Sequence, residues 1–325
     1  MASGGGWRGR ILDVEVHRWS ALWFDDGSPV RAASAIAPFG SEWLIAQDDA
    51  THAAWWRDDE VTRLRLFPPV DGHDLFSDEE GTKRLKPDLE AACAVDHDGT
   101  PAVLLLGSGS LPNRTRVALV SESPTRPMVK AADLTSLYDD VARALGVPQA
   151  RRNLEGACVV DGRLRWFQRG DRRRGVIDAS VDVDLDALLA AVAGDADPAR
   201  VPVGDVRRYD LGILDDLDAE GSVPLAITDA VVLDRGRVLV SAAAEDTDDP
   251  VADGPVSAAA LAVLDGEDVI AGSLLPTDAE GTVPKVEGLA IVAASTDAVD
   301  LLAVVDADDP TIASPVIHLT VSGLT

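Results

Sequence analysis

The sequence predicts an all-β protein, a β-propeller with five blades. Three observations lead to this fold class: a short motif recurs along the chain, each copy continues through a turn into a second apolar run, and two segments between copies are nearly identical. The chain has 325 residues, 46% of them hydrophobic. Closed β architectures of this length form single domains, so we expect one propeller spanning residues 1–325.

The recurring motif is an acidic residue inside a short apolar run. Its copies lie at 88–95 (DLEAACAV), 153–160 (NLEGACVV), 227–233 (ITDAVVL) and 285–292 (KVEGLAIV), with a weaker one at 33–37 (ASAIA). The segments 218–224 (DAEGSVP) and 278–284 (DAEGTVP) precede two of the copies. Repeated strand pairs with turns between them are typical of radially arranged sheets.

Each copy is expected to begin a blade. The predicted blades span residues 34–70, 88–130, 153–213, 225–275 and 285–325. The last blade has room for only three strands, so we expect the strand of residues 11–16 to supply the fourth. Closing the ring in this way removes the exposed edges of an open sheet. A sixth blade formed around residues 19–30 is the alternative.

Two short helices are expected to interrupt the strands. Asp133 can cap a helix over residues 134–145, and Gly146 ends it. The second helix runs over residues 184–193 and ends at Gly194.

The charge balance argues against two classes of partner. The chain has 29 Lys and Arg against 56 Asp and Glu, a net charge of −27, which repels nucleic acid and anionic lipid. No apolar run reaches the roughly 20 residues of a membrane span, and the start lacks the apolar core of a signal peptide. Two cysteines are too few for a disulfide framework. We therefore expect a cytoplasmic protein, a monomer, that contacts neither nucleic acid nor membrane.

The acidic position of the motif should begin the innermost strand of each blade. Its carboxylates, on Glu90, Glu155, Asp229 and Glu287, would then face one central channel. Clustered carboxylates repel unless cations lie between them. Ca²⁺ is one solution, because it takes six to eight oxygen ligands, and Asn153 would add an amide oxygen. The other solution is neutralisation by the protein's own cations, which are Lys86, Arg114, Arg169 and Lys285. Both alternatives stay open.

Polar residues also follow the second strand of each copy. These runs lie at 47–49, 107–110, 168–170, 245–247 and 306–308, and we expect them at the mouth of the same channel. The run 107–114 offers backbone N–H groups, hydroxyls and a guanidinium that could hold an oxyanion; the alternative is a Gly-Ser turn with an arginine that caps the blade. The predicted residues for a small or anionic ligand are Lys86, Ser108, Ser110, Asn113, Arg114, Arg169, Glu245 and Lys285.

Seven motifs in a fixed order carry a family resemblance over about residues 34–320. They are KPDLEA (86–91), GSGS with an arginine (107–114), NLEG (153–156), RG (169–170), TDA (228–230), AEDT (244–247) and KVEGL (285–289). In these motifs the chain resembles a bacterial propeller family of unassigned function and, more distantly, esterase-like phytase and calcium-dependent lactonase-type propellers. The resemblance implies a propeller with Ca²⁺ held by Glu90, Asn153, Glu155, Asp229 and Glu287.

Three functions are compatible with these observations. The first is metal-assisted hydrolysis of a small ester, lactone or phosphoester, in which the cation polarises the substrate or activates water. The second is binding of a small ligand or protein without catalysis. The third is a scaffold with an ion-paired channel. No nucleophile motif favours the first, and fold analogy alone does not decide among them.

Overall fold

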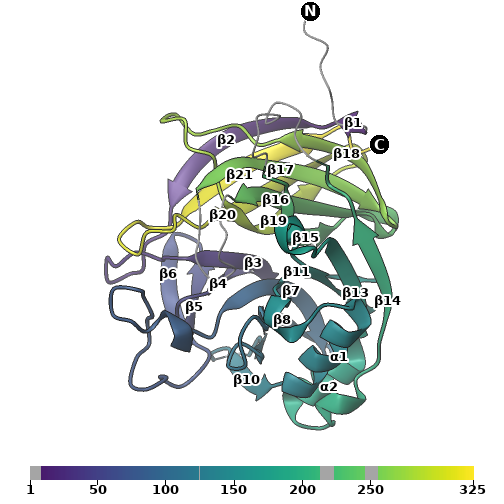
Figure 1. Ribbon diagram of the computed structural model, residues 1–325. Coiled ribbons are helices and arrows are strands. Elements are labelled where there is room, and N and C mark those ends of the chain that lie inside the picture. The colour runs from purple at the N-terminus through teal and green to yellow at the C-terminus, as the bar shows by residue number, and fades with distance from the viewer. Residues whose placement is uncertain (1–8, 124, 213–222, 246–254) are drawn as a thin grey trace, which may run out of the picture.

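The computed structural model describes residues 9–123, 125–212, 223–245 and 255–325. In this part of the chain the strands form five sheets, four with four strands and one with five. The inner strands of successive sheets contact one another in a closed ring, and Figure 1 shows the sheets packed side by side around that ring. The predicted all-β propeller with five blades is confirmed.

The blades follow one another along the chain, and neighbouring strands within a blade are antiparallel. The first contains β3 (Ala33–Phe39), β4 (Glu42–Gln47), β5 (His52–Arg57) and β6 (Glu60–Arg65). The second contains β7 (Leu89–His97), β8 (Thr100–Gly107), β9 (Arg116–Ser121) and β10 (Met128–Asp133). The third contains β11 (Leu154–Val160), β12 (Arg163–Gln168), β13 (Asp178–Asp184) and β14 (Val203–Tyr209). The fourth contains β15 (Ala226–Val232), β16 (Val238–Glu245), β17 (Val256–Asp265) and β18 (Asp268–Leu274). The fifth contains β19 (Val286–Ala294), β20 (Ala298–Val305) and β21 (Pro315–Ser322).

The N-terminal strand closes the ring as predicted. β2 (Asp13–Ala21) pairs antiparallel with β21, from Asp13 opposite Ser322 to Ala21 opposite Pro315. It is longer than expected, and a two-residue strand before it, β1 (Arg10–Ile11), adds a parallel edge to the fourth blade. Residues 19–30 form no sixth blade, because the start of that segment belongs to β2 and its remainder contributes an isolated bridge between Trp23 and Pro29.

The inner strands approach one another closely. A Cβ atom on Gly156 would lie 2.7 Å from Cα of Asp229 in the next blade. Real Cβ atoms do not come this near to backbone, so only glycine allows β11 and β15 to pack at this distance. The side chains that face between blades are apolar and pack into continuous cores.

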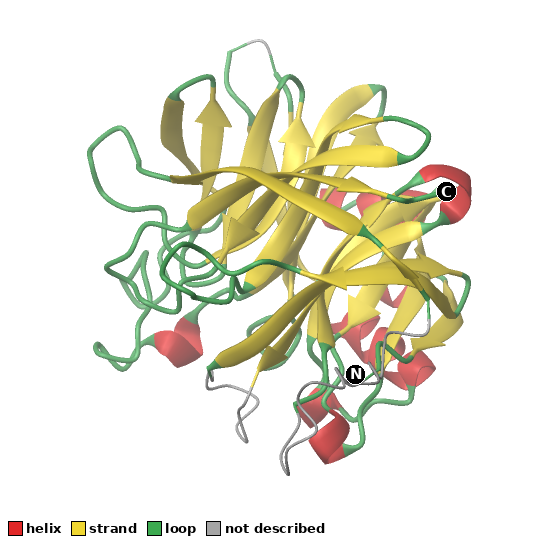
Figure 2. Cartoon of the chain, turned by 90° about the horizontal axis from the view of Figure 1, so that it is seen from above, coloured by secondary structure: helices red, strands yellow, loops and turns green. Residues whose placement is uncertain are grey.

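Both predicted helices are present at the periphery (Figure 2). Helix α1 (Thr135–Leu145) begins one residue later than expected. Its N-cap is Leu134, and the Asp133 carboxylate accepts the backbone N–H of Thr135, the first helical residue. Helix α2 (Leu185–Ala193) is capped by Asp184, which accepts the backbone N–H of Ala187. The two helices share one apolar cluster with the second and third blades.

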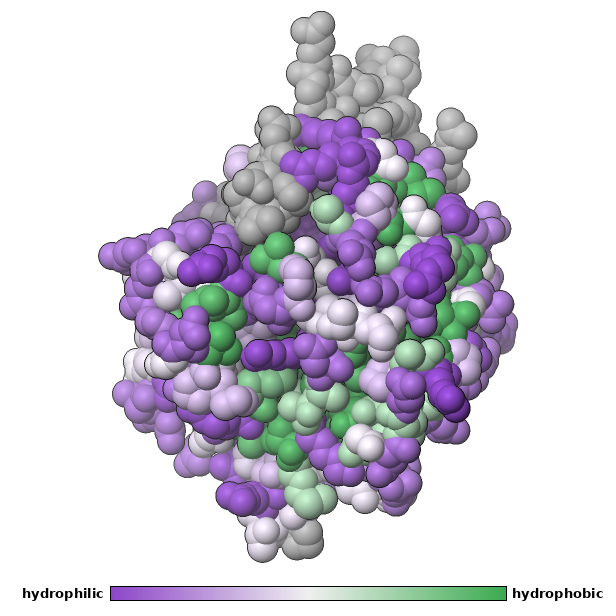
Figure 3. Space-filling model, turned by 60° about the horizontal axis from the view of Figure 1, so that its bottom comes forward, coloured by the Kyte–Doolittle hydropathy of each residue, from purple (hydrophilic) through white to green (hydrophobic). Residues whose placement is uncertain are grey.

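The surface is consistent with the acidic composition. The face seen in Figure 3 is mostly hydrophilic, with hydrophobic residues scattered over it. Among the described helices, none has the length and apolar character to cross a membrane. Cys93 and Cys158 are buried free thiols.

Candidate functional site

A pocket of about 300 Å³ lies at the end of the propeller where the inner strands begin. Every blade contributes a residue from the start of its inner strand and one from the end of its second strand. The first members are Ser34, Glu90, Glu155, Ala226 and Glu287, and the second are Asp48, Ser110, Arg169, Glu245 and Asp306. The repeat therefore brings the same two regions of all five blades around one opening.

One side of the pocket is organised by Asp88, which is 2% exposed. We call Asp48, Lys86, Asp88, Ser108, Ser110 and Arg114 the Lys86 cluster. The Lys86 ammonium contacts Asp48 and lies 2.7 Å from Asp88 Oδ1. Asp88 Oδ2 accepts from Arg114 at 3.0 Å and from the hydroxyls of Ser108 and Ser110. Burial opposes ionisation of Asp88, but Lys86 and Arg114 hold its pKa below the usual value.

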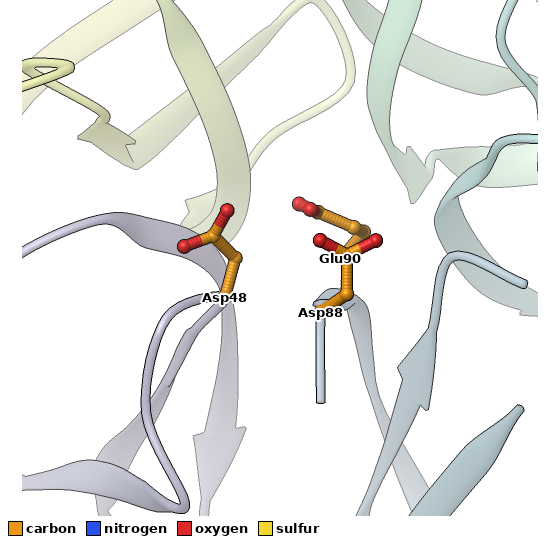
Figure 4. Close-up of side chains that lie close together, drawn as sticks. All are labelled: Asp48, Asp88 and Glu90. Carbon is orange, nitrogen blue, oxygen red and sulfur yellow. The ribbon is translucent and has the colours of Figure 1, made fainter. Parts of the chain in front are cut away.

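Glu90 lies beside this cluster without a cation of its own. Figure 4 shows its carboxylate and that of Asp48 extending toward each other from neighbouring blades. Oxygen atoms of Asp48, Asp88 and Glu90 lie within 4.8 Å of one another, yet among the described residues Glu90 forms no ion pair. Burial, followed by the charges of Asp88 and Asp48, raises the pKa of Glu90 well above its usual value.

These three carboxylates could hold a metal ion, but they do not form an open calcium site. Both oxygens of Asp88 already accept from protein donors, and the Lys86 ammonium contacts Asp48 as well. Since Ca²⁺ requires six to eight oxygens, Lys86 would have to move away before a cation bound. Neutralisation by lysine and arginine accounts for Asp48 and Asp88 as the residues stand.

The other side of the pocket is organised by one guanidinium. We call Glu155, Arg169, Glu245, Lys285 and Glu287 the Arg169 cluster. Arg169 lies 3.1 Å from Glu155, 2.7 Å from Glu245 and 4.0 Å from Glu287. Lys285 contacts Glu287 at 3.5 Å, Glu245 at 3.6 Å and Asp308 at 3.1 Å. These ion pairs join the third, fourth and fifth blades.

Two carboxylates of the Arg169 cluster, those of Glu155 and Glu287, hold protons more tightly than that of Asp88. Burial raises the pKa of Glu155 to about 8, against the opposing effect of Arg169 and with a further rise from Glu287. Burial also raises the pKa of Glu287, although Lys285 and Arg169 oppose it. The Asn153 amide donates to Glu155 at 2.7 Å. Asp306, which forms no ion pair with any described residue, has a pKa raised well above its usual value by burial.

Two other predicted site residues serve the local structure. Ser108 is fully buried and donates to Asp88. The Asn113 amide donates to the carbonyls of Arg84 and Lys86 and so supports the segment that carries the Lys86 ammonium.

The prediction that Asp229 occupies the acidic position of the fourth blade is wrong. The strand register shifts at Glu90 in β7, at Glu287 in β19 and at Thr228 in β15. A bulge redirects the side chains on either side of it, so Thr228 takes the equivalent position and Asp229 follows one residue later. The Asp229 carboxylate instead accepts the backbone N–H of Leu289 at 2.6 Å.

Sequence reasoning missed several residues that line the pocket. Asp48 and Asp306 belong to the runs that follow second strands, where Arg169 and Glu245 were selected, so their position was a usable signal. The segment 171–176 gave no such signal. Asp171 and Val176 exchange two backbone hydrogen bonds of 2.9 Å, and the tight turn between them carries Arg172, Arg173 and Arg174 to the pocket opening.

The deeper residues of the pocket lining are mostly acidic, and the more exposed ones are mostly basic. We call its deeper residues the floor: the acids Asp48, Asp88, Glu90, Glu155, Glu245, Glu287 and Asp306, with the bases Lys86, Arg114, Arg169 and Lys285. We call its more exposed residues the rim: Arg151, Asp171, Arg172, Arg173 and Arg174. Seven acids against four bases give the floor a formal charge of −3, and four bases against one acid give the rim +3. Arg152, also in the lining, is buried beneath the rim and donates to the carbonyl of Gly109.

The comparison with family profiles matches residues 82–310, which cover most of the pocket. The chain belongs to a family of unknown function (DUF6910). The resemblance to a propeller family without an assigned function is thereby supported, whereas the likeness to phytase and lactonase propellers stays a prediction. Curated proteins give no match.

This DUF6910 protein is similar to several solved structures at low sequence identity. One is glutaminyl cyclase of Myxococcus xanthus, at 9% identity and a TM-score of 0.47, covering 98% of this chain and 100% of that one. Another is the PQQ-bound aldose sugar dehydrogenase of Streptomyces coelicolor, at 11% identity and a TM-score of 0.44, covering 96% and 98%. A third is the α-L-arabinanase of Penicillium chrysogenum in complex with arabinobiose, at 9% identity and a TM-score of 0.41, covering 96% and 98%. At these identities and TM-scores the likeness carries no conclusion about activity or ligands.

Proposed function

We propose that the pocket binds a small zwitterionic molecule, with its anionic group at the rim and its cationic group at the floor. The observation that carries this proposal is the sorting of charge by depth. Nine of the 29 Lys and Arg residues line this one pocket, in a chain whose net charge is −27. Four of these nine cations lie at the rim with one acid, Asp171, and this excess of positive charge attracts an anion that the remaining surface repels.

The floor supplies the complementary end of the ligand site. Glu90 and Asp306 border the pocket and form no ion pair with a described residue. An ammonium group beside them would favour their charged forms, which burial now disfavours. At about 300 Å³ the pocket is at the small end of ligand sites, which favours a compact ligand over a polymer.

A matched set of three compounds tests this proposal. We expect 4-aminobutyrate to bind about tenfold more tightly than either butyrate or butylamine, because only the zwitterion satisfies floor and rim together. Calorimetric titration at low ionic strength measures the three affinities, and 6-aminohexanoate serves as a longer homologue. Equal affinity for all compounds, or no binding of any, would refute the proposal.

Two variants test which pocket residues contact the anionic group and which contact the cationic group of the ligand. Arg172→Ala should weaken the binding of 4-aminobutyrate and of butyrate alike, whereas Glu90→Gln should weaken 4-aminobutyrate and leave butyrate unchanged. Arg200→Ala is the matched control, since the Arg200 side chain is 86% exposed, pairs with Asp197 at 3.9 Å and lies outside the pocket.

Metal-assisted hydrolysis is the second candidate, and the three-carboxylate cluster favours it. Here a divalent cation would take the place of the ligand's ammonium beside Asp48, Asp88 and Glu90, after Lys86 had moved. The chemistry it would supply is polarisation of an ester or phosphoester oxygen. Thermal unfolding of chelator-treated protein, with and without Ca²⁺, tests this candidate. A rise in Tm with Ca²⁺ would support it and lead to a screen of lactones and phosphoesters, and an unchanged Tm would count against it.

A further inference from the structure

Asp178 is the first residue of β13 and lies fully buried behind the pocket wall. One of its oxygens, Oδ1, accepts two backbone N–H groups: that of Gly170 at 2.9 Å and that of Ile227 at 2.8 Å. Gly170 belongs to the third blade, directly after the pocket residue Arg169, whereas Ile227 lies on the inner strand of the fourth blade. A single carboxylate therefore joins two blades at the pocket.

The contact with Gly170 depends on the absence of a side chain. A Cβ atom on Gly170 would lie 2.5 Å from Asp178 Oδ2 and 3.0 Å from the Asp178 backbone nitrogen. Glycine is required wherever another group approaches the backbone this closely. Gly170 thus allows the Asp178 carboxylate to approach the backbone directly after the pocket residue Arg169.

The same carboxylate sits at the base of the arginine rim. The turn that carries Arg172–Arg174 is closed by the backbone pair of Asp171 and Val176, and Gly170 and Asp178 flank that pair on either side. A movement at Gly170 would be transmitted to Arg169 on the floor and to the arginines of the rim.

Asp178 Oδ2 has no hydrogen-bond partner among the described residues, which is costly for a buried carboxylate. Burial raises the pKa of Asp178 to about 6, although the N–H groups of Ile227 and Gly170 and the charges of Arg172 and Arg169 oppose the rise. Tyr209 lies opposite Asp178 in the strand register and directs its hydroxyl to Ser180. The charged groups that act on the Asp178 carboxylate are Arg172 and Arg169.

We propose that Asp178 is a positioning residue of the pocket, whose carboxylate fastens the Arg169-Gly170 segment and the arginine rim to the fourth blade, and that protonation of this carboxylate loosens the rim and weakens anion binding. This inference rests on the proposed function, because it assumes that the rim holds an anion. A charged acceptor makes stronger hydrogen bonds than a neutral one, so the two backbone contacts weaken when the proton arrives.

We expect protonation of Asp178 to leave the protein folded. Because the folded-state pKa lies above the usual value, the folded state binds the proton more tightly than the unfolded chain does. The contribution of Asp178 to the free energy of unfolding therefore rises as the pH falls through about 6. Loss of affinity with retained stability distinguishes this mechanism from ordinary acid denaturation.

The test compares Asp178→Asn with wild type, using sulfate as the probe because its charge is constant in this pH range. We expect the variant to bind sulfate about tenfold more weakly near pH 7.5 and with nearly wild-type affinity near pH 5, where the wild-type carboxylate is itself protonated. The same ratio at both pH values would overturn the inference. Titration of the other pocket carboxylates affects both proteins and cancels in the ratio.

Amide hydrogen exchange tests the same inference without a ligand. The amides of Gly170 and Ile227 should exchange about tenfold faster in Asp178→Asn than in wild type, while amides of the distant β20–β21 pair should not change. Failure of wild type to bind sulfate would refute the proposed function, and the exchange rates would still decide the role of Asp178. If Asp178→Asn does not fold, Gly170→Ala disturbs the contact from the other side, and unaltered sulfate affinity in that variant would contradict the inference.

Discussion

The Lys86 cluster and the Arg169 cluster on the pocket floor neutralise buried carboxylates in opposite ways. In the Lys86 cluster one carboxylate, Asp88, receives two cations and two hydroxyl groups. In the Arg169 cluster one guanidinium is shared among three glutamates. The pKa of Asp88 is lowered and that of Glu155 is raised to about 8, although both side chains are almost completely buried.

Burial does not by itself determine whether a channel carboxylate is charged. Desolvation is the largest effect on the pKa of both Asp88 and Glu155, and the number of donors around each carboxylate decides the result. Glu90 is two residues from Asp88 and lacks those donors, so its pKa is raised. A propeller can therefore place charged and protonated carboxylates side by side on one floor.

The largest expected effect comes from removing the shared guanidinium. Arg169→Met would leave three buried glutamates with Lys285 as their remaining cation, and breaking a buried ion pair costs about 3–5 kcal/mol. We expect a loss of this size in the free energy of unfolding at about pH 9, where Glu155 is ionised, measured with urea. The loss should shrink as the pH falls, because the glutamates with raised pKa become neutral.

The matched control for this prediction is Arg200→Met. Arg200 is an exposed arginine whose pair with Asp197 spans 3.9 Å, and such surface pairs contribute at most about 1 kcal/mol. A similar loss of stability in both variants would mean that the Arg169 cluster does not need its cation.

The sequence predicts the architecture well because the repeat carries it. Each main feature of the architecture has a local signal in the sequence. The motif copies mark the blades, the short last blade indicates that the N-terminal strand completes it, and Gly146 and Gly194 mark the ends of the helices. The structure contains all three features. The acidic residue at the start of β7, β11 and β19 is also visible in the motif, which explains why Glu90, Glu155 and Glu287 were found.

The sequence predicts the details of the pocket less well because they depend on strand register and on contacts between blades. A bulge in β15 decides whether Thr228 or Asp229 takes the position that Glu90 has in β7. The bulge moves the register by one residue, and the sequence alone does not reveal it. Asp178 lies 49 residues from Ile227 along the chain, and nothing local to either residue indicates their hydrogen bond. The arginines of 172–174 reach the opening only because a short turn projects them.

The smallest expected effects are changes in the free energy of unfolding on substituting Asp88 and Glu90, and they have opposite signs. Asp88→Asn should lower the free energy of unfolding by about 2 kcal/mol near pH 7, because it removes the acceptor of several charge-assisted hydrogen bonds. Asparagine tolerates the left-handed backbone of this residue, whose φ is 58°. Glu90→Gln should raise the free energy of unfolding by about 1 kcal/mol, because it removes a buried carboxyl that must either take up a proton on folding or carry an unpaired charge.

The pH dependence of the two variants checks the signs. The lowered pKa of Asp88 means that its carboxylate stabilises the fold above the usual Asp pKa, a contribution that is lost as the pH falls through the folded-state value. The raised pKa of Glu90 means that this carboxyl favours the folded state more as the pH falls. As the pH falls, the free energies of unfolding of wild type and variant should therefore approach each other for both substitutions. Asp88→Asn approaches wild type from lower stability and Glu90→Gln from higher stability. If both substitutions destabilise the protein equally near pH 7, Glu90 has a cationic partner in solution and the proposed contact with a ligand's ammonium group loses its basis.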